Sequence, residues 1–311
     1  MTAPTPPSPS GGPASCWEHR GLYEHIIEAI YALPDRFSSP LHIEGVPATD
    51  LFTMNSALGA AIEKSVVESL NDLREIWDPN KRYADYSFVR QTQCFPDVVL
   101  KTGRPDLVLD SILIGIELKG WFVLSKEGEP SFRYKINPEC CSPADLLVVL
   151  PWVFSSVISG RPFLMDPIIS EARFAALQRN YHWEWLRKNP TGQAQSLRGI
   201  TPALDRRYYP QKTAKSADIP ISDSGGNFGR VARCGIMDSE IDARLSEPLL
   251  GIPADAWRRF IQIFADGASP ATIESGVKGL ERAFDTANLS REQREQTAEL
   301  LNEIANKLRD L

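Results

Sequence analysis

Apolar and other residues alternate along ILIGIELK, residues 112–119. This period of two predicts a strand that buries one face and leaves the other for a different role. Two stretches before it, residues 94–102 and 105–109, have the length and composition of strands. The run DLLVVLPWVF at 145–154 is almost entirely apolar, which predicts a buried central strand covered on both faces. The middle of the chain is therefore expected to form a β-sheet.

A tight turn after residues 105–109 would join that stretch to the following strand as a hairpin. Asp106 then lies opposite Gly115 and one diagonal step, roughly 7–8 Å, from Glu117. Lys119 shares a face with Glu117 because alternate residues of a strand point the same way. Acids and a lysine on an otherwise apolar sheet are costly unless they are used or solvated. The pattern therefore predicts a site on this hairpin.

Apolar residues at helical spacing predict helices on both sides of the strands. The first lies at residues 17–32, and the second, at 56–76, carries Glu63 beside its core stripe. A third predicted helix follows the strands at residues 170–187. The order of helix, strands and helix is that of an α/β sandwich.

Composition divides the chain into four parts. Residues 1–16 are rich in Pro, Ser and Gly, which predicts a disordered tail. Residues 17–190 hold the predicted sandwich. Residues 191–247 are rich in Gly, Pro, Ser and basic residues, whereas residues 248–311 have the periodicity of a helical subdomain.

Pro105-Asp106, ten intervening residues and then Glu117-Leu118-Lys119 resemble the signature of the PD-(D/E)XK nuclease superfamily. The resemblance covers about residues 55–190 and makes residues 17–190 the expected nuclease core. It implies a restriction-endonuclease-like α/β fold, in which a three-layer core has a central mixed sheet flanked by helices. The C-terminal helical subdomain would be an addition to that core. Taken alone, a Glu-X-Lys pattern is also typical of a solvent-facing ion pair on a strand.

The resemblance further implies a metal site for phosphodiester hydrolysis. Asp106 and Glu117 would bind Mg²⁺, with the backbone carbonyl of Leu118 as a third ligand, and Mn²⁺ would substitute. Lys119 would orient or deprotonate the attacking water, or stabilise the charge of the transition state. The superfamily also places an acid on the helix before the strands, and Glu63 matches that catalytic position best.

Two positions leave alternatives open. Glu68 competes with Glu63 for the acidic position on the helix. Pro96-Asp97 is a second Pro-Asp pair, separated from Glu117 by nineteen residues. Asp97 is therefore a rival to Asp106, an additional metal ligand, or only the start of a strand.

The net charge of -6 is not that of a simple electrostatic DNA binder, although it leaves room for a local basic groove. Basic, aromatic and Gly-rich residues gather at 206–233. This segment is either a DNA-contacting loop or a solvated loop that carries a few cations. In the first case, the residues expected to bind DNA are Lys212, Lys215, Asn227, Arg230 and Arg233.

Five cysteines without a CxxC pair and four scattered histidines argue against a disulfide framework and against a zinc site. No apolar run is long enough to cross a bilayer, so no membrane partner is expected. Residues 1–16 also lack the features of a secretory signal. These observations favour the reducing cytoplasm. The P-loop motif is absent from the sequence, and no nucleotide cofactor is expected.

Together, these features favour a Mg²⁺-dependent endonuclease that acts on double-stranded DNA, and in the first place a type II restriction enzyme of a restriction–modification pair. A palindromic target would favour a homodimer. The alternatives are a repair or recombination nuclease with the same chemistry and a non-catalytic DNA-binding module.

Overall fold

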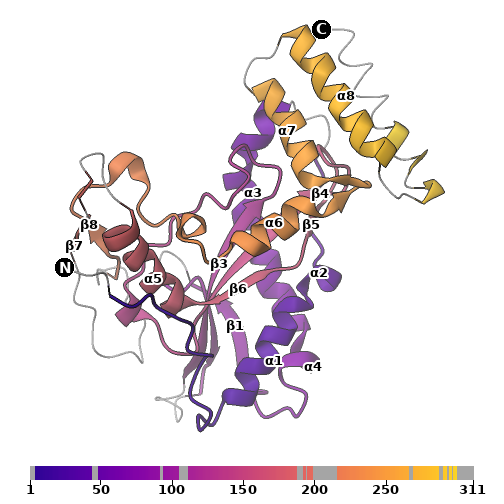
Figure 1. The fold of residues 1–311 in the computed structure, drawn as a ribbon. Helices are drawn as coiled ribbons and strands as arrows, with labels where there is room; N and C mark the ends of the chain where they lie inside the picture. The colour runs from indigo at the N-terminus through magenta and orange to yellow at the C-terminus, as the bar shows by residue number, and fades with distance from the viewer. Residues whose placement is uncertain are drawn as a thin grey trace.

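A computed structural model describes residues 4–43, 48–91, 94–104, 111–187, 192–193, 195–198, 216–265, 269–286, 290–292, 294–295 and 297–299. It has an α/β architecture in which a curled mixed sheet is flanked by helices (Figure 1). Within the described ranges, no helix combines the length and the apolar character needed to span a membrane.

The main sheet has six strands in the order β1-β2-β3-β4-β5, and β6 also pairs with β4. The pairs β1–β2 and β2–β3 are antiparallel, β3 and β4 are parallel, and β4 is antiparallel to both β5 and β6. The strands are β1 (Tyr86–Arg90), β2 (Val98–Thr102), β3 (Ile112–Phe122), β4 (Leu146–Phe154), β5 (Pro162–Leu164) and β6 (Ile168–Glu171).

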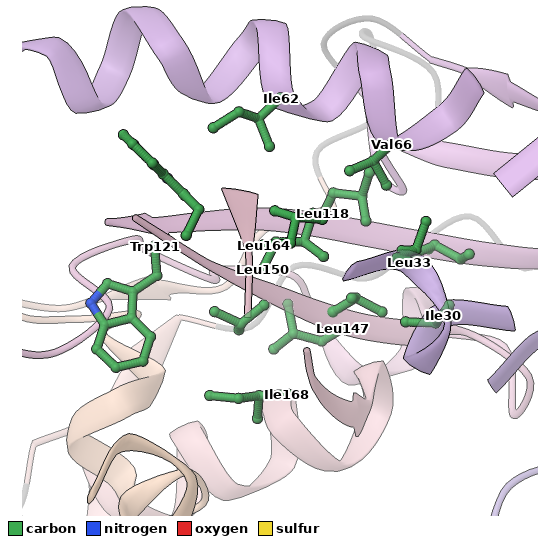
Figure 2. Close-up of a cluster of buried hydrophobic side chains, with 14 of the residues drawn as sticks. Ile30, Leu33, Ile62, Val66, Leu118, Trp121, Leu147, Leu150, Leu164 and Ile168 are labelled. Atoms are coloured by element: carbon green, nitrogen blue, oxygen red, sulfur yellow. The ribbon is translucent and has the colours of Figure 1, made fainter. Parts of the chain in front are cut away.

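Helices cover both faces of this sheet. The helix α3 packs on β1 and β3, whereas α5 packs on β4 and β6. Figure 2 shows Ile62 and Val66 of α3 on one side of the strands and Ile168 on the other. The helices are α1 (Arg20–Tyr31), α2 (Leu33–Arg36), α3 (Ala48–Asp72), α4 (Arg74–Trp77), α5 (Ala172–Tyr181), α6 (Asp238–Ser246), α7 (Ala254–Ala265) and α8 (Pro270–Thr286), and a π-helical turn, His182–Leu186, follows α5.

The central strand predicted from the apolar run at 145–154 is β4, and every one of its nine residues is buried. Its parallel partner β3 is also buried on both faces over most of its length. Both strands are buried on two faces because layers of helices cover a parallel pair from above and below. These two strands form the middle of the core, and β3 carries Glu117 and Lys119.

The predicted hairpin register is wrong. Gly115 pairs with Val99 of β2, and its N–H donates to Asp145 Oδ1 at 3.0 Å, so both edges of β3 are occupied where Asp106 was expected. The hairpin partner of β3 is therefore β2, within the predicted strand 94–102. Residues 105–110, including Asp106, lie outside the described residues.

The N-terminal residues are not a disordered tail over their whole length. The backbone N–H groups of Ser10, Gly11 and Gly12 donate to the carboxylate of Glu171, at 2.9, 2.7 and 3.0 Å. The Ser10 hydroxyl also donates to it, at 2.7 Å. Arg20 holds the same segment through the carbonyl of Gly11, at 2.8 Å. These contacts fix the segment beside the N-terminus of α5.

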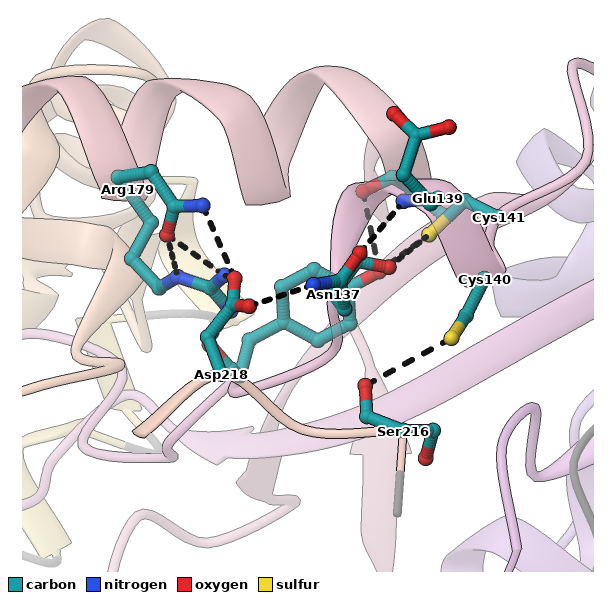
Figure 3. A network of polar contacts seen from close by, with 10 residues as sticks. Asn137, Glu139, Cys140, Cys141, Arg179, Ser216 and Asp218 are labelled. Atoms are coloured by element: carbon teal, nitrogen blue, oxygen red, sulfur yellow. Dashed lines mark hydrogen bonds and ion pairs between the residues drawn. The ribbon is translucent and has the colours of Figure 1, made fainter. Parts of the chain in front are cut away.

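The segment 216–253 is described as short, irregular elements around α6. It contains β8 (Ile219–Pro220), which pairs with β7 (Leu197–Arg198), and the small hairpin of β9 (Pro248–Leu249) and β10 (Ile252–Pro253). Figure 3 shows how its start is anchored. Asp218 forms a buried ion pair with Arg179 of α5 and accepts a hydrogen bond from Asn137 Nδ2 at 2.7 Å.

The C-terminal helices share the main hydrophobic core. Trp257 and Ile261 of α7 are fully buried, together with Leu280 of α8, and they belong to the same cluster as the sheet residues. The helix α7 also packs on α3 (Figure 1). Over the described residues, the predicted helical subdomain is therefore continuous with the sandwich.

Candidate active site

The strand β3 extends past the start of its neighbour β2. The last pair between them is Ile116 with Val98, whereas β3 continues to Phe122 with β4 on its other side. Asp97 immediately precedes β2, and its Oδ2 accepts a hydrogen bond from the N–H of Leu118 at 3.0 Å. Beyond the first residue of β2, the carboxylate of Asp97 therefore takes the place of a strand partner for Leu118 of β3.

Lys119 connects the two acids on this edge. Its Nζ lies 3.0 Å from Asp97 Oδ2 and 2.8 Å from Glu117 Oε1. Glu117 and Lys119 are two positions apart on β3 and therefore point to the same face. The alternation in the sequence predicted this shared face, and the structure places Asp97 beside it.

Glu63 and Arg90 border the same cluster. Glu63 comes from α3, and its Oε2 lies 3.0 Å from Arg90 Nη2 at the end of β1. Arg90 is paired with Val98 in the β1–β2 ladder, so it is anchored next to Asp97. The charges of Asp97 and Lys119 both act on Glu63. The acid from the helix thus belongs to the same electrostatic group as the acids from the sheet.

Gln91 fixes the loop that carries Asp97. Its backbone N–H donates to the carbonyl of Asp97 at 2.7 Å, and its side-chain Nε2 donates to the carbonyl of Pro96 at 3.0 Å. These two bonds hold the end of the connection from β1 to β2. They place the Asp97 side chain at the free edge of β3.

Burial and neighbouring charges act in opposite directions on the central ion pair. Burial raises the pKa of Glu117, Lys119 opposes the rise, and Asp97 adds to it, with a net pKa of about 7. Burial lowers the pKa of Lys119, but Glu117 and Asp97 outweigh that effect and raise it above its ordinary value. Burial also raises the pKa of Glu63. In the described site, the two carboxylates therefore keep this lysine protonated.

The donor atoms of the cluster are oxygens, which suit Mg²⁺. Asp97 and Glu117 supply carboxylates. The carbonyl of Leu118 points to the same edge as its N–H, which bonds Asp97, because both groups of a strand residue point to one side. Among the described residues, no three Asp, Glu, His or Cys side chains already form a metal-binding group. Two carboxylates and one carbonyl nevertheless fit a metal ion that retains several waters.

The other predicted site residues lie elsewhere or outside the described residues. Glu68, the rival of Glu63, has a side chain that is 64% exposed and lies 3.8 Å from Lys64, so it belongs to the surface of α3. Lys212 and Lys215, like Asp106, fall outside the described ranges.

The predicted DNA-binding residues that are described engage one another and nearby acids. Arg230 Nη1 lies 3.1 Å from Glu127, and Arg233 forms an ion pair with Glu129. Arg233 also donates to the side-chain oxygen of Asn227 at 2.7 Å. These arginines would have to exchange carboxylates for phosphates in order to bind DNA.

The sequence did not point to Arg90 and Gln91, because it gave no clear sign of the strand that ends at Arg90. The strand β1, YSFVR, is only five residues long. Its signal is the alternation of buried Tyr86 and Phe88 with less buried positions, ending at Arg90. A pattern this short is hard to distinguish from a loop.

Comparisons with protein-family models, curated proteins and solved structures found no match to this chain.

Proposed function

We propose that this chain is a Mg²⁺-dependent DNA endonuclease of the PD-(D/E)XK type. The observation that carries the proposal is the meeting of Asp97, Glu117 and Lys119 at the edge of β3 that β2 leaves open. Glu63 approaches the same cluster from α3. A mixed sheet with helices on both faces supports a restriction-endonuclease-like core.

In this proposal, Asp97, Glu117 and the Leu118 carbonyl would hold the metal ion. Bound there, Mg²⁺ would supply an activated water and positive charge beside the scissile phosphate. Asp97 takes the role first assigned to Asp106, because its carboxylate bonds the Leu118 N–H and Lys119. Glu63 of α3 lies close enough to this group for the charges of Asp97 and Lys119 to act on it.

Lys119 would act as a fixed cation in this site. Its raised pKa keeps the ammonium charged. As a charged ammonium, Lys119 would orient the attacking water and stabilise charge on the phosphate oxygens. With Mg²⁺ bound to the same two carboxylates, Lys119 would favour the neutral amine, which could instead take a proton from the water. Its two carboxylate contacts, at 3.0 and 2.8 Å, fix the position of Nζ.

The more specific proposal is a type II restriction enzyme, acting as a homodimer on double-stranded DNA in the cytoplasm. The segment 206–233 would contact the DNA, with Lys212, Lys215, Asn227, Arg230 and Arg233 as its contact residues. Asp218, within this segment, is anchored to α5 by its buried ion pair with Arg179, which supports a fixed position for the described part of the segment.

Incubation of the protein with plasmid DNA of mixed sequence and Mg²⁺ tests the proposal. Discrete fragments support the restriction enzyme, whereas smearing or structure-selective nicking supports a repair nuclease. DNA binding without cleavage would leave a non-catalytic DNA-binding module. We expect Asp97→Asn and Lys119→Ala each to lower the cleavage rate by about a hundredfold or more.

Two variants serve as controls for the site assignment. Asp85→Asn removes the acid of an exposed ion pair with Arg104, outside the site, and should leave cleavage near the wild-type rate. Asp106→Asn decides between the two aspartates. Loss of cleavage in Asp106→Asn, together with retention in Asp97→Asn, would return the metal ligand to Asp106.

A further inference from the structure

Arg90 is the most exposed member of the charged cluster. The exposed fraction of its side chain is 40%, compared with 22% for Glu63, 29% for Asp97 and 20% for Lys119. Glu117 is the most buried, with a side chain that is 10% exposed. The cluster thus runs from a buried carboxylate to an open guanidinium. Arg90 is therefore the more accessible of the two cations in the cluster.

The balance of charge makes this order important. Three carboxylates in the cluster repel a phosphodiester, and Lys119 is held between two of them. Among the described residues, the ion-pair partner of Arg90 is Glu63, which contacts only Nη2. A guanidinium presents five N–H donors in a planar fork that matches the oxygens of a phosphate. Arg90 therefore has donors to offer without leaving Glu63.

The backbone of Arg90 is held in place by its neighbours. Arg90 pairs with Val98 in the sheet, and the next residue, Gln91, bonds the carbonyls of Pro96 and Asp97. Two residues earlier, both the N–H and the C=O of Phe88 bond the side chain of Asn71 on α3. An arginine on such a fixed strand end presents its charge in a defined direction.

We propose that Arg90 binds a phosphate of the DNA backbone at this site and positions the strand for hydrolysis. The inference rests on the proposed nuclease function and adds a substrate contact to it. A simpler role for Arg90 is to hold Glu63 through their ion pair. That role needs no contact with DNA, so measurements of DNA binding distinguish it from phosphate binding.

Measurement of DNA binding in Ca²⁺, and of cleavage in Mg²⁺, tests Arg90→Gln and Arg90→Lys. We expect Arg90→Gln to raise both Kd and KM by roughly 10- to 100-fold. Arg90→Lys should lie between Arg90→Gln and the wild type, because it keeps the charge but not the fork. Loss of one phosphate contact should also reduce the slope of log Kd against log salt by about 0.9.

Arg173→Gln is the matched control. Arg173 has a side chain that is 39% exposed and an ion pair at 3.0 Å with Glu139, almost the same values as Arg90, but it lies on α5. We expect this variant to bind DNA with the wild-type Kd and salt slope. Melting temperatures of both variants would show that the fold is kept.

A double-mutant cycle with Glu63→Gln separates phosphate binding from support of Glu63. If Arg90 binds DNA, Arg90→Gln still weakens binding and lowers the salt slope in the Glu63→Gln background. If Arg90 only supports Glu63, the second substitution has no further effect, and the inference is overturned. A wild-type protein that neither binds nor cleaves DNA would overturn the proposed function itself, whereas normal activity in Arg90→Gln would overturn only the role of Arg90.

Discussion

At the scale of single residues, the Lys119 ammonium forms ion pairs with two acids at once. Its ammonium lies close to both Asp97 and Glu117, which lets three buried or half-buried charges share a small space. Removal of one member would leave an uncompensated charge in a poorly solvated place. The ion pairs of Lys119 therefore hold Asp97 and Glu117 close together without a ligand.

The pH dependence of stability should reveal the state of Glu117. Its pKa of about 7 in the folded chain lies above the ordinary value of 4.5, so the folded state binds an extra proton between these values. Its contribution to stability is therefore largest at low pH and is lost as the pH rises from about 4.5 to 7. We expect this fall to be absent in Glu117→Gln. Thermal unfolding at pH 5 and pH 8 measures the difference.

Lys119 does not change this expectation, because its raised pKa keeps it charged across the whole window. Glu127→Gln, at a side chain that is 40% exposed, is a suitable surface control. Equal pH slopes for the wild type and Glu117→Gln would contradict the raised pKa.

The choice of aspartate shows what residue-level sequence reasoning can reach. Glu117 and Lys119 could be identified because their shared face follows from local alternation. The position of Asp97 beside them could not be predicted, because it depends on the pairing of β2 with β3. Residues 105–109 resemble a strand in composition. A hairpin between them and the strand at 112–119 was therefore predicted instead of the pairing of β2 with β3. A register between strands is set by long-range packing, which a local pattern does not contain.

At the scale of elements, α3 supports the sheet edge that carries Arg90. The strand β1 lies at the end of the sheet, where one row of its backbone groups has no partner among the described strands. Asn71 of α3 takes that place for Phe88. Its Nδ2 donates to the carbonyl at 2.9 Å, and its Oδ1 accepts from the N–H at 2.9 Å. The side chain thus replaces a neighbouring strand.

Asn71→Leu should destabilise the chain by about 2–4 kcal/mol, because two backbone groups of Phe88 lose their partners. Asn71→Asp keeps the acceptor but loses the donor, so we expect a smaller loss. Chemical denaturation measures both values. Gln178→Leu, which removes one side-chain bond to the carbonyl of Cys234, provides a single-bond comparison. A loss in Asn71→Leu no greater than this single-bond loss would refute the role as a strand substitute.

Long elements were easier to predict from the sequence than short ones. The long, continuous pattern of β4 and the periodic pattern of α3 were both recognisable. The short strand β1 and the pairs β7–β8 and β9–β10 were not, because two to five residues hold too few positions to show a period. Such elements are fixed by their partners rather than by their own sequence.

At the scale of the whole molecule, one core joins the sheet to the C-terminal helices. Trp257 of α7 is fully buried, and its indole N–H donates to the carbonyl of Leu249 at 2.9 Å. A change in composition along a chain marks a boundary in sequence, but it does not show whether apolar faces pack together. The sequence therefore suggested a separate subdomain that the continuous core does not support.

Trp257→Ala should lower the stability of the whole chain by about 3–5 kcal/mol. Trp257→Phe keeps most of the apolar volume and loses the indole bond, so we expect a smaller loss of about 1 kcal/mol. Because the core is shared, unfolding followed by circular dichroism and by tryptophan fluorescence should give coincident transitions. A variant in which α7 unfolds separately, while the sheet keeps its wild-type midpoint, would disprove the shared core.

The bond between Ser10 and Glu171 spans 161 positions of the chain. During synthesis, at roughly 5–20 residues per second, the N-terminal segment is made about 8–32 seconds before its partner. Until Glu171 emerges from the ribosome, Ser10, Gly11 and Gly12 cannot form these bonds. These three residues are thus made well before they can reach their final place. Docking of this segment therefore has to follow the synthesis of β6, the strand that ends at Glu171.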